Sequence, residues 1–225
     1  MKNLTLKAFG GLFFLLVVMG ILLFVPAGTL NYWQGWAFLS VFGGSALVIT
    51  LYLMKNDPKL LERRVLAGPT AEKLKAEKII QSITSVWFVA MLVIPGIDHR
   101  FHWSRMSTSL SIVGNIIVFL GFLIIFYVYK ENSFTSATIE VGVGQKVIST
   151  GLYGLVRHPM YMGAFFLFIG MSLSLGSWWD FALFFIVMPS LLWRLFDEEN
   201  FLAKNLQGYK EYQNKVKYHL IPFLW

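Results

Sequence analysis

No charged residue occurs between Ala8 and Met54, and so long an uncharged stretch severely limits how the chain can fold. Pro26, Gly28 and Asn31 divide the stretch into two apolar segments of about 20 residues, the length that a helix needs to cross a bilayer. Over the whole chain 56% of residues are hydrophobic and only 14% are charged, whereas about 25% are charged in soluble domains. The sequence therefore predicts an all-α, polytopic integral membrane helical bundle.

The first apolar segment has a second possible interpretation, because Lys2 and Lys7 precede it as the basic region of a cleavable signal peptide would. The apolar run is long for a signal peptide, and a second apolar segment follows it at once. We therefore expect a retained helix.

Four further apolar spans follow in the remaining sequence, which makes about six in total. Lys55–Lys78 is a polar loop, partly helical at its ends, and Lys130–Arg157 is a long polar segment before the fifth span. The predicted third to sixth spans are Ile79–Ile97, Leu110–Tyr129, Met160–Gly176 and Phe181–Trp193. Six spans and their loops account for all 225 residues, so we expect one compact membrane domain.

The distribution of basic residues predicts the orientation of these spans. If the N-terminus is cytosolic, 17 of the 19 Lys and Arg residues face the cytosol, and only Arg100 and Arg105 lie outside. The positive-inside rule then predicts an integral membrane protein with cytosolic N- and C-termini, in the cytoplasmic membrane if the protein is prokaryotic. Topology thus explains the basic net charge, and we expect no nucleic-acid partner.

A charged run, RLFDEEN, follows the predicted sixth span at Arg194–Asn200. The 13 residues of that span rise only about 20 Å, against a hydrocarbon core of about 30 Å. Arg194, Asp197 and Glu198 share one helical face and are expected at or just below the cytosolic interface, where charges mark functional sites. The alternative is a snorkelling arginine with surface ion pairs on an amphipathic tail helix.

A second motif, QKVISTGLYGLVRHPMYMG, leads from Gln145 into the fifth span. Its glycines allow tight turns, and Pro159 suits the first turn of a helix. A helix N-terminus with His158, Tyr153 and Tyr161 is a plausible platform for a small ligand, although a membrane-entry turn with aromatic anchors has a similar composition. We expect this motif and the charged run to meet at one polar site.

Two kinds of site are excluded. The chain has no cysteine, and therefore no disulfide, thiolate nucleophile or cysteine-ligated metal. Asp98, His99 and His102 are loosely spaced and lie on the side opposite the charged run, so we predict no metal. His219, in the tail, is interpreted as a docking residue beside an aromatic anchor.

The runs STGLYGLVRHPMYMG, RLFDEENFL and GYKEYQNKVKYHLIPFLW, in this order and spacing, resemble the isoprenylcysteine carboxyl methyltransferase family and its prokaryotic relatives. The resemblance covers about 132–225. It implies an integral membrane enzyme that uses S-adenosyl-L-methionine without a G-x-G-x-x-G motif, and none is present. It also implies that a C-terminal region, 131–225, forms a cofactor pocket on the cytosolic side, and the four apolar spans before it make up an N-terminal region, 1–130.

The resemblance assigns roles to individual residues. Arg194 matches the position that binds a substrate carboxylate, and Arg194 and Glu198 are the implied catalytic residues. Glu140 stands where the family usually has glutamine, so its contact with the cofactor stays open. The implied cofactor-binding residues are Gln145, Lys146, Val147, Ile148, Tyr153, His158, Pro159, Met160, Tyr161 and Glu198.

The expected reaction is methylation of a lipophilic or prenylated substrate that enters from the bilayer, with isoprenylcysteine carboxylate as the first choice. A carboxylate is ionised at neutral pH and needs no general base, whereas an amine must first lose a proton, for which His158 is the nearby base. Three alternatives stay open: a phospholipid or amine methyltransferase, an NADPH-dependent reductase like the sterol reductases, and a non-catalytic protein. Sterol reductases usually have Asn and Asp where this chain has Met160 and Ala164.

Overall fold

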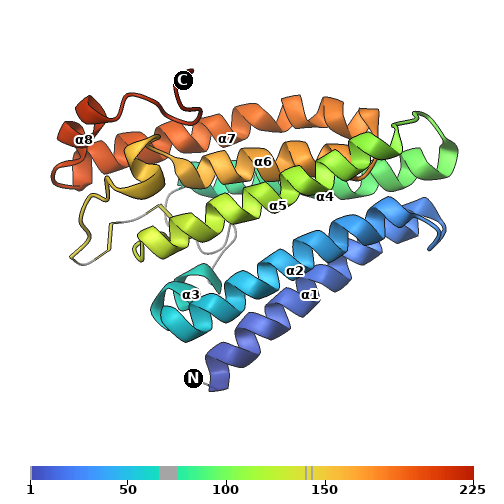
Figure 1. Ribbon diagram of the computed structural model, residues 1–225, viewed down its shortest axis with the longest axis horizontal. Helices are drawn as coiled ribbons and strands as arrows, with labels where there is room; N and C mark the ends of the chain where they lie inside the picture. Colours follow the sequence, from blue (N-terminus) through green and yellow to red (C-terminus); the bar gives the residue numbers. More distant parts are fainter. Residues whose placement is uncertain (1, 66–74, 140, 143) are drawn as a thin grey trace.

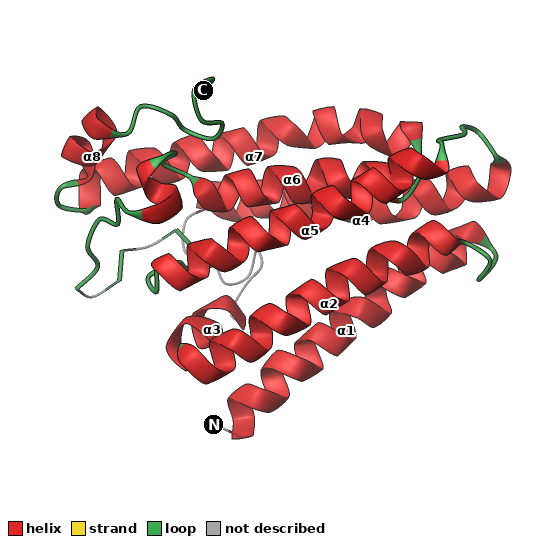
Figure 2. Cartoon of the chain, in the orientation of Figure 1, coloured by secondary structure: helices red, strands yellow, loops and turns green. Residues whose placement is uncertain are grey.

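The structure is a computed structural model that describes residues 2–65, 75–139, 141–142 and 144–225. In this part of the chain every regular element is a helix (Figure 2). The long helices are α1 (Lys2–Ala27), α2 (Trp33–Asn56), α4 (Lys75–Phe101), α5 (Thr108–Glu131), α6 (Pro159–Ser174) and α7 (Trp178–Asn205). The short elements are α3 (Pro58–Val65), the 3₁₀ turn η1 (Gly151–Gly154) and α8 (Tyr209–Lys215).

The prediction of a helical membrane bundle is confirmed. Among the described residues, five helices are long and apolar enough to cross a membrane: α1, α2, α4, α5 and α7. The predicted fifth span corresponds to α6, whose 16 residues rise about 24 Å. Successive long helices run antiparallel, so that the N-terminus and α8 lie at the same end of the bundle (Figure 1). The assignment of that end to the cytosol stays a prediction.

Helix α7 extends beyond the predicted sixth span. That span ends at Trp193, and the helix continues to Asn205 through the charged run, where we expected Arg194, Asp197 and Glu198 to share one helical face. The reason is that residues 194–205 contain neither glycine nor proline, and the chain turns only near Gly208, which has φ +83°. The charged side chains therefore project from a continuous helix.

Helices α5 and α6 pack closely because glycines face each other along their contact. A Cβ atom on Gly121 would lie 2.9 Å from the carbonyl oxygen of Gly163, and one on Gly163 would lie 3.1 Å from that of Gly121. Seven residues along each helix, a Cβ atom on Gly170 would lie 3.0 Å from the carbonyl oxygen of Gly114, and one on Gly114 would lie 2.2 Å from the backbone nitrogen of Ser174. Small residues let membrane helices approach closely. This contact fixes where α6, and hence the motif at its N-terminus, lies.

We expect Gly114→Ala to lower the free energy of unfolding by roughly 1–3 kcal/mol, the usual cost of overpacking. The added methyl group would overlap the backbone nitrogen of Ser174, which cannot move as a side chain could. Thermal unfolding in detergent measures the effect. Gly11→Ala is the control, because no atom lies within 4 Å of a Cβ at that position. Equal melting temperatures for the two variants would contradict the close contact.

Hydrogen bonds hold the end of the bundle opposite α8. Asp98 accepts hydrogen bonds from the backbone and hydroxyl of Ser104, at 2.7 and 2.5 Å, and from the hydroxyl of Ser177 at 2.5 Å. Tyr32 donates to the carbonyl of Leu175 at 2.6 Å and stacks on His99. Asp98 therefore links the segment that contains Ser104 to the turn that contains Ser177.

The described residues contain no cluster of three His, Cys, Asp or Glu side chains that could hold a metal.

Candidate functional site

A cavity of about 380 Å³ lies near α8, at the end of the bundle where α7 carries its charged run. This volume is within the range of small-molecule sites, roughly 300–1,000 Å³. All the residues that the resemblance assigned to the cofactor or substrate line it: Gln145, Lys146, Val147, Ile148, Tyr153, His158, Pro159, Met160, Tyr161, Arg194 and Glu198. The geometry thus brings the two sequence motifs together, while their individual roles stay predictions.

The N-terminus of α6 is fixed by the C-terminal tail. The backbone nitrogens of Arg157 and His158 donate to the carbonyls of Tyr218 and His219, at 2.8 and 3.0 Å. Pro159 then occupies the first turn of the helix, where its missing N–H costs no hydrogen bond. These bonds position Met160 and Tyr161 on the cavity wall.

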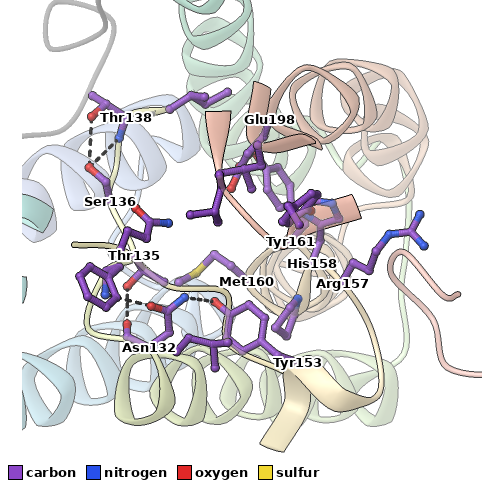
Figure 3. A pocket seen from close by; sticks show the side chains of 18 of the residues that line it. Asn132, Thr135, Ser136, Thr138, Tyr153, Arg157, His158, Met160, Tyr161 and Glu198 are labelled. Atoms are coloured by element: carbon purple, nitrogen blue, oxygen red, sulfur yellow. Dashed lines mark hydrogen bonds between the residues drawn. The ribbon is translucent and has the colours of Figure 1, made fainter. Parts of the chain in front are cut away.

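Tyr161 and Glu198 form a polar pair on one side of the cavity (Figure 3). The Tyr161 hydroxyl donates to Oε2 of Glu198 at 2.6 Å. Because this bond leaves the second carboxylate oxygen of Glu198 without a hydrogen bond from the described protein, Glu198 can accept one from a ligand. Met160 lies between this pair and the opposite wall (Figure 3).

The opposite wall is built around Tyr153. Asn132 donates its side-chain amide to the Tyr153 hydroxyl at 3.0 Å, and the Tyr212 hydroxyl donates to the Tyr153 carbonyl at 2.7 Å. Burial raises the pKa of Tyr153, against the opposing effect of the Asn132 bond, so the phenol stays neutral and can donate a hydrogen bond. Neither Asn132 nor Tyr212 was among the predicted site residues.

Residues 132–139 form another part of the wall, and polar side chains from three helices hold their carbonyl groups. On α3, Arg63 donates to Ser133 and Arg64 donates to Ser136, the latter at 2.6 Å. The carbonyl of Ala137 accepts from Gln81 of α4 at 3.4 Å and from Arg194 of α7 at 3.0 Å. Arg64 and Gln81 also line the cavity, so the N-terminal region contributes to it.

Arg194 has a partner that the sequence did not reveal. Its Nη1 atom forms an ion pair with Oε2 of Glu77, the third residue of α4. The Glu77 side chain is fully buried, and that of Arg194 is 15% exposed. Arg194 is thus held by a buried ion pair within the protein. In the sequence, Glu77 is only one of several charged residues in the polar loop Lys55–Lys78.

Glu199, which we did not select from the sequence, forms a buried cluster behind the cavity. Its carboxylate pairs with Nε of Arg157 at 2.7 Å and Nε2 of His219 at 3.1 Å, and accepts from Gln213 at 2.8 Å. Arg157 also donates to the carbonyls of Val216 and Lys217. Its side chain points away from the cavity (Figure 3). The cluster therefore attaches the tail to α7.

His219 makes the attachment of the tail sensitive to pH. Burial, together with the charge of Arg157 and the neighbouring His158, lowers the pKa of His219, and the nearby Glu199 carboxylate opposes this shift. In the unfolded chain histidine titrates near 6.5, so below that pH the unfolded state binds more protons. We expect the melting temperature to fall as pH decreases below about 6.5. His219→Gln should weaken this dependence, and an unchanged dependence in that variant would contradict the role of His219.

The predicted docking role of His219 agrees with its ring contact, since it stacks on Trp225 with centroids 4.9 Å apart. Glu140, whose contact with the cofactor was left open, lies outside the described residues.

Two comparisons with known proteins found similarity to this chain. A Delta(14)-sterol reductase of Mus musculus is 29% identical over 91 residues, which are 39% of this chain and 22% of that protein. This chain thus spans less than a quarter of the relative's length. The family model described as phospholipid methyltransferase matches residues 110–208, from the first turn of α5 to Gly208. All the predicted cofactor and substrate residues thus lie within a segment that matches the phospholipid methyltransferase family.

Proposed function

We propose that the protein is an integral membrane methyltransferase that transfers a methyl group from S-adenosyl-L-methionine to a membrane lipid or another lipophilic acceptor. One observation carries this proposal: a single cavity gathers all the residues implied as cofactor-binding, within the segment that matches phospholipid methyltransferases. We also propose that the cavity opens on the cytosolic side, where the cofactor is dissolved, and that the acceptor arrives from the bilayer.

The donor groups of the cavity suit this cofactor, which supplies an electrophilic methyl group on a sulfonium. Glu198 offers a carboxylate to the positive charges of the cofactor, and Tyr153 offers a neutral phenol as a hydrogen-bond donor. Lys146 can pair with the carboxylate of the cofactor. Because the sulfonium is already reactive, the protein has mainly to hold the methyl carbon in line with the attacking atom.

The acceptor proposed first is the carboxylate of an isoprenylcysteine, with Arg194 as its binding residue. A carboxylate needs no general base, and a guanidinium can bind it with two parallel hydrogen bonds. In the structure, however, Glu77 already pairs with Arg194.

A phospholipid amine is the second candidate acceptor. Two observations favour it: the family matched is that of phospholipid methyltransferases, and Glu77 already neutralises Arg194. The sterol reductase relative raises a third possibility, a hydride transfer, which needs NADPH in place of the methyl donor.

The test is methyl transfer by the purified protein in vesicles that contain phosphatidylethanolamine and a farnesylated cysteine, with methyl-labelled S-adenosylmethionine. We expect label in the organic extract, and loss of most of it in Glu198→Gln. The matched control is Glu211→Gln, which removes an exposed carboxylate on α8. Absence of label with either acceptor, combined with oxidation of NADPH in the presence of a sterol, would contradict the proposal.

A further inference from the structure

We propose that a groove between α2 and α5 binds an anionic phospholipid, with an acyl chain along the groove and the phosphate at Lys55 and Lys130. The groove has a volume of about 630 Å³ and shares no lining residue with the cavity of the candidate functional site. The inference therefore goes beyond the proposed methyltransferase function and does not depend on it.

The groove lies along two membrane-spanning helices that run in the same direction (Figure 1). Its lining extends from Ser40 to Ile49 on α2 and from Ile112 to Phe126 on α5, and it contains no charged residue. The Tyr52 and Phe126 rings are in edge contact, with centroids 4.8 Å apart, and join the two helices near their C-terminal ends. The occupant of such a lining is a hydrocarbon chain.

The rims of the groove are open to the surroundings of the helices. Val48 is 62% exposed and Ile116 is 53% exposed, and a Cβ atom on Gly44 would meet nothing within 4 Å. The lining of α5 rises about 21 Å, which is more than half of the roughly 30 Å thickness of the hydrocarbon core. The groove is thus accessible from the bilayer and long enough for an acyl chain from one leaflet.

A lysine continues each rim of the groove at the end of the bundle near α8. Lys55, in the last turn of α2, follows Val48 by seven residues. Lys130, in the last turn of α5, follows Leu123 by seven residues. Residues seven apart lie on nearly the same face of a helix. Two cations therefore stand where the headgroup of a lipid in the groove would lie.

Both lysines are available to an anion. Lys55 and Lys130 are exposed, and neither forms a hydrogen bond or an ion pair with the described residues. Of the nearby carboxylates, Asp57 accepts a hydrogen bond from the backbone of α3 at 3.0 Å, and Glu131 accepts one from the hydroxyl of Thr150. Residues 55–65 and 130–131 together carry five basic and three acidic side chains, so this end of the groove is basic.

The charge of the lipid follows from this arrangement. Basic residues at the membrane surface attract anionic headgroups. The headgroup of phosphatidylcholine adds a positive charge to the phosphate, whereas that of phosphatidylglycerol leaves the negative charge uncompensated. A phospholipid with net negative charge therefore gains more from the two lysines.

The test is native mass spectrometry of the full chain in detergent, with added phosphatidylglycerol or phosphatidylcholine of identical acyl chains. We expect the wild type to bind phosphatidylglycerol about tenfold more tightly. Lys55→Gln/Lys130→Gln should lose most of this preference. The matched control is Lys210→Gln/Lys215→Gln, which removes two exposed lysines of α8 at the same end of the bundle and should keep it.

A second variant tests whether the acyl chain occupies the groove. Gly44→Leu fills part of the groove and leaves both lysines in place, so it should weaken binding of both lipids at least fivefold. Gly11→Leu is its control, because a Cβ atom on Gly11 also meets nothing within 4 Å but lies on α1, outside the groove. That control should bind both lipids as the wild type does.

Equal affinity of the wild type for the two lipids overturns the proposal. Unchanged binding of phosphatidylglycerol in the double lysine variant, or in a folded Gly44→Leu, also overturns it. So does a dimer of the chain that forms in place of bound lipid, which the same spectra detect by its mass. If Gly44→Leu does not fold, the exposed lysines decide. None of these outcomes bears on binding of S-adenosylhomocysteine, which tests the methyltransferase function separately.

Discussion

Replacing Glu199 with alanine is expected to lower the free energy of unfolding by about 3–5 kcal/mol, the usual effect of removing one partner from a buried ion pair. The Glu199 carboxylate pairs with Arg157 at 2.7 Å, and both side chains are only 8% exposed. Without it, the buried guanidinium of Arg157 would lose its carboxylate partner and keep only its bonds to backbone carbonyls and its contact with His219. The tail would then detach from α7, and the N-terminus of α6 would lose the backbone bonds that position it.

Thermal unfolding in detergent, followed by circular dichroism, measures this effect. Asp197→Ala is the matched control, since it removes a carboxylate two residues away that forms no ion pair with the described residues. The control should melt within a few degrees of the wild type, whereas Glu199→Ala should melt far below it. A Glu199→Ala protein as stable as the control would show that the cluster does not hold the tail.

Glu198→Gln is expected to weaken binding of S-adenosylmethionine about ten- to hundredfold, because a hydrogen bond to a charged group contributes about 1.5–3 kcal/mol. The substitution keeps the shape of the side chain and its bond from Tyr161 but removes the negative charge. The product S-adenosylhomocysteine has no sulfonium charge, so its affinity should fall less.

Calorimetric titration of both ligands gives the comparison. Tyr161→Phe is a useful second variant, because it leaves the charge of Glu198 in place and removes only the bond that orients it. We expect a smaller loss there, with no difference between the two ligands. If Glu198→Gln bound both ligands as the wild type does, Glu198 would not contact the cofactor.

Much of the fold could be predicted because the membrane imposes a simple rule on composition. Uncharged segments of about 20 residues indicate spans, and the structure places helices at all six predicted positions. The hydropathy pattern predicted the uncharged part of α7 but not where the helix ends, because the backbone continues until a breaker such as Gly208.

The cavity could be anticipated from the two motifs, because the helices that carry them are close in the sequence. Its other contributors could not. The pairing of Glu77 with Arg194 joins residues 117 positions apart, and no periodicity predicts which charges of a polar loop will be buried. Glu198 and Glu199 are adjacent and chemically alike, yet one faces the cavity and the other faces Arg157. They differ only in the direction in which each side chain leaves α7, and that direction depends on how the helix is rotated about its axis.

The most direct test of the proposed function is calorimetric binding of S-adenosylhomocysteine and, in a separate titration, of NADPH to the wild-type protein in detergent. The methyltransferase proposal predicts saturable binding of S-adenosylhomocysteine at one site per chain, lost or weakened in Glu198→Gln, and no binding of NADPH. Binding of NADPH alone would contradict it and would favour a reductase.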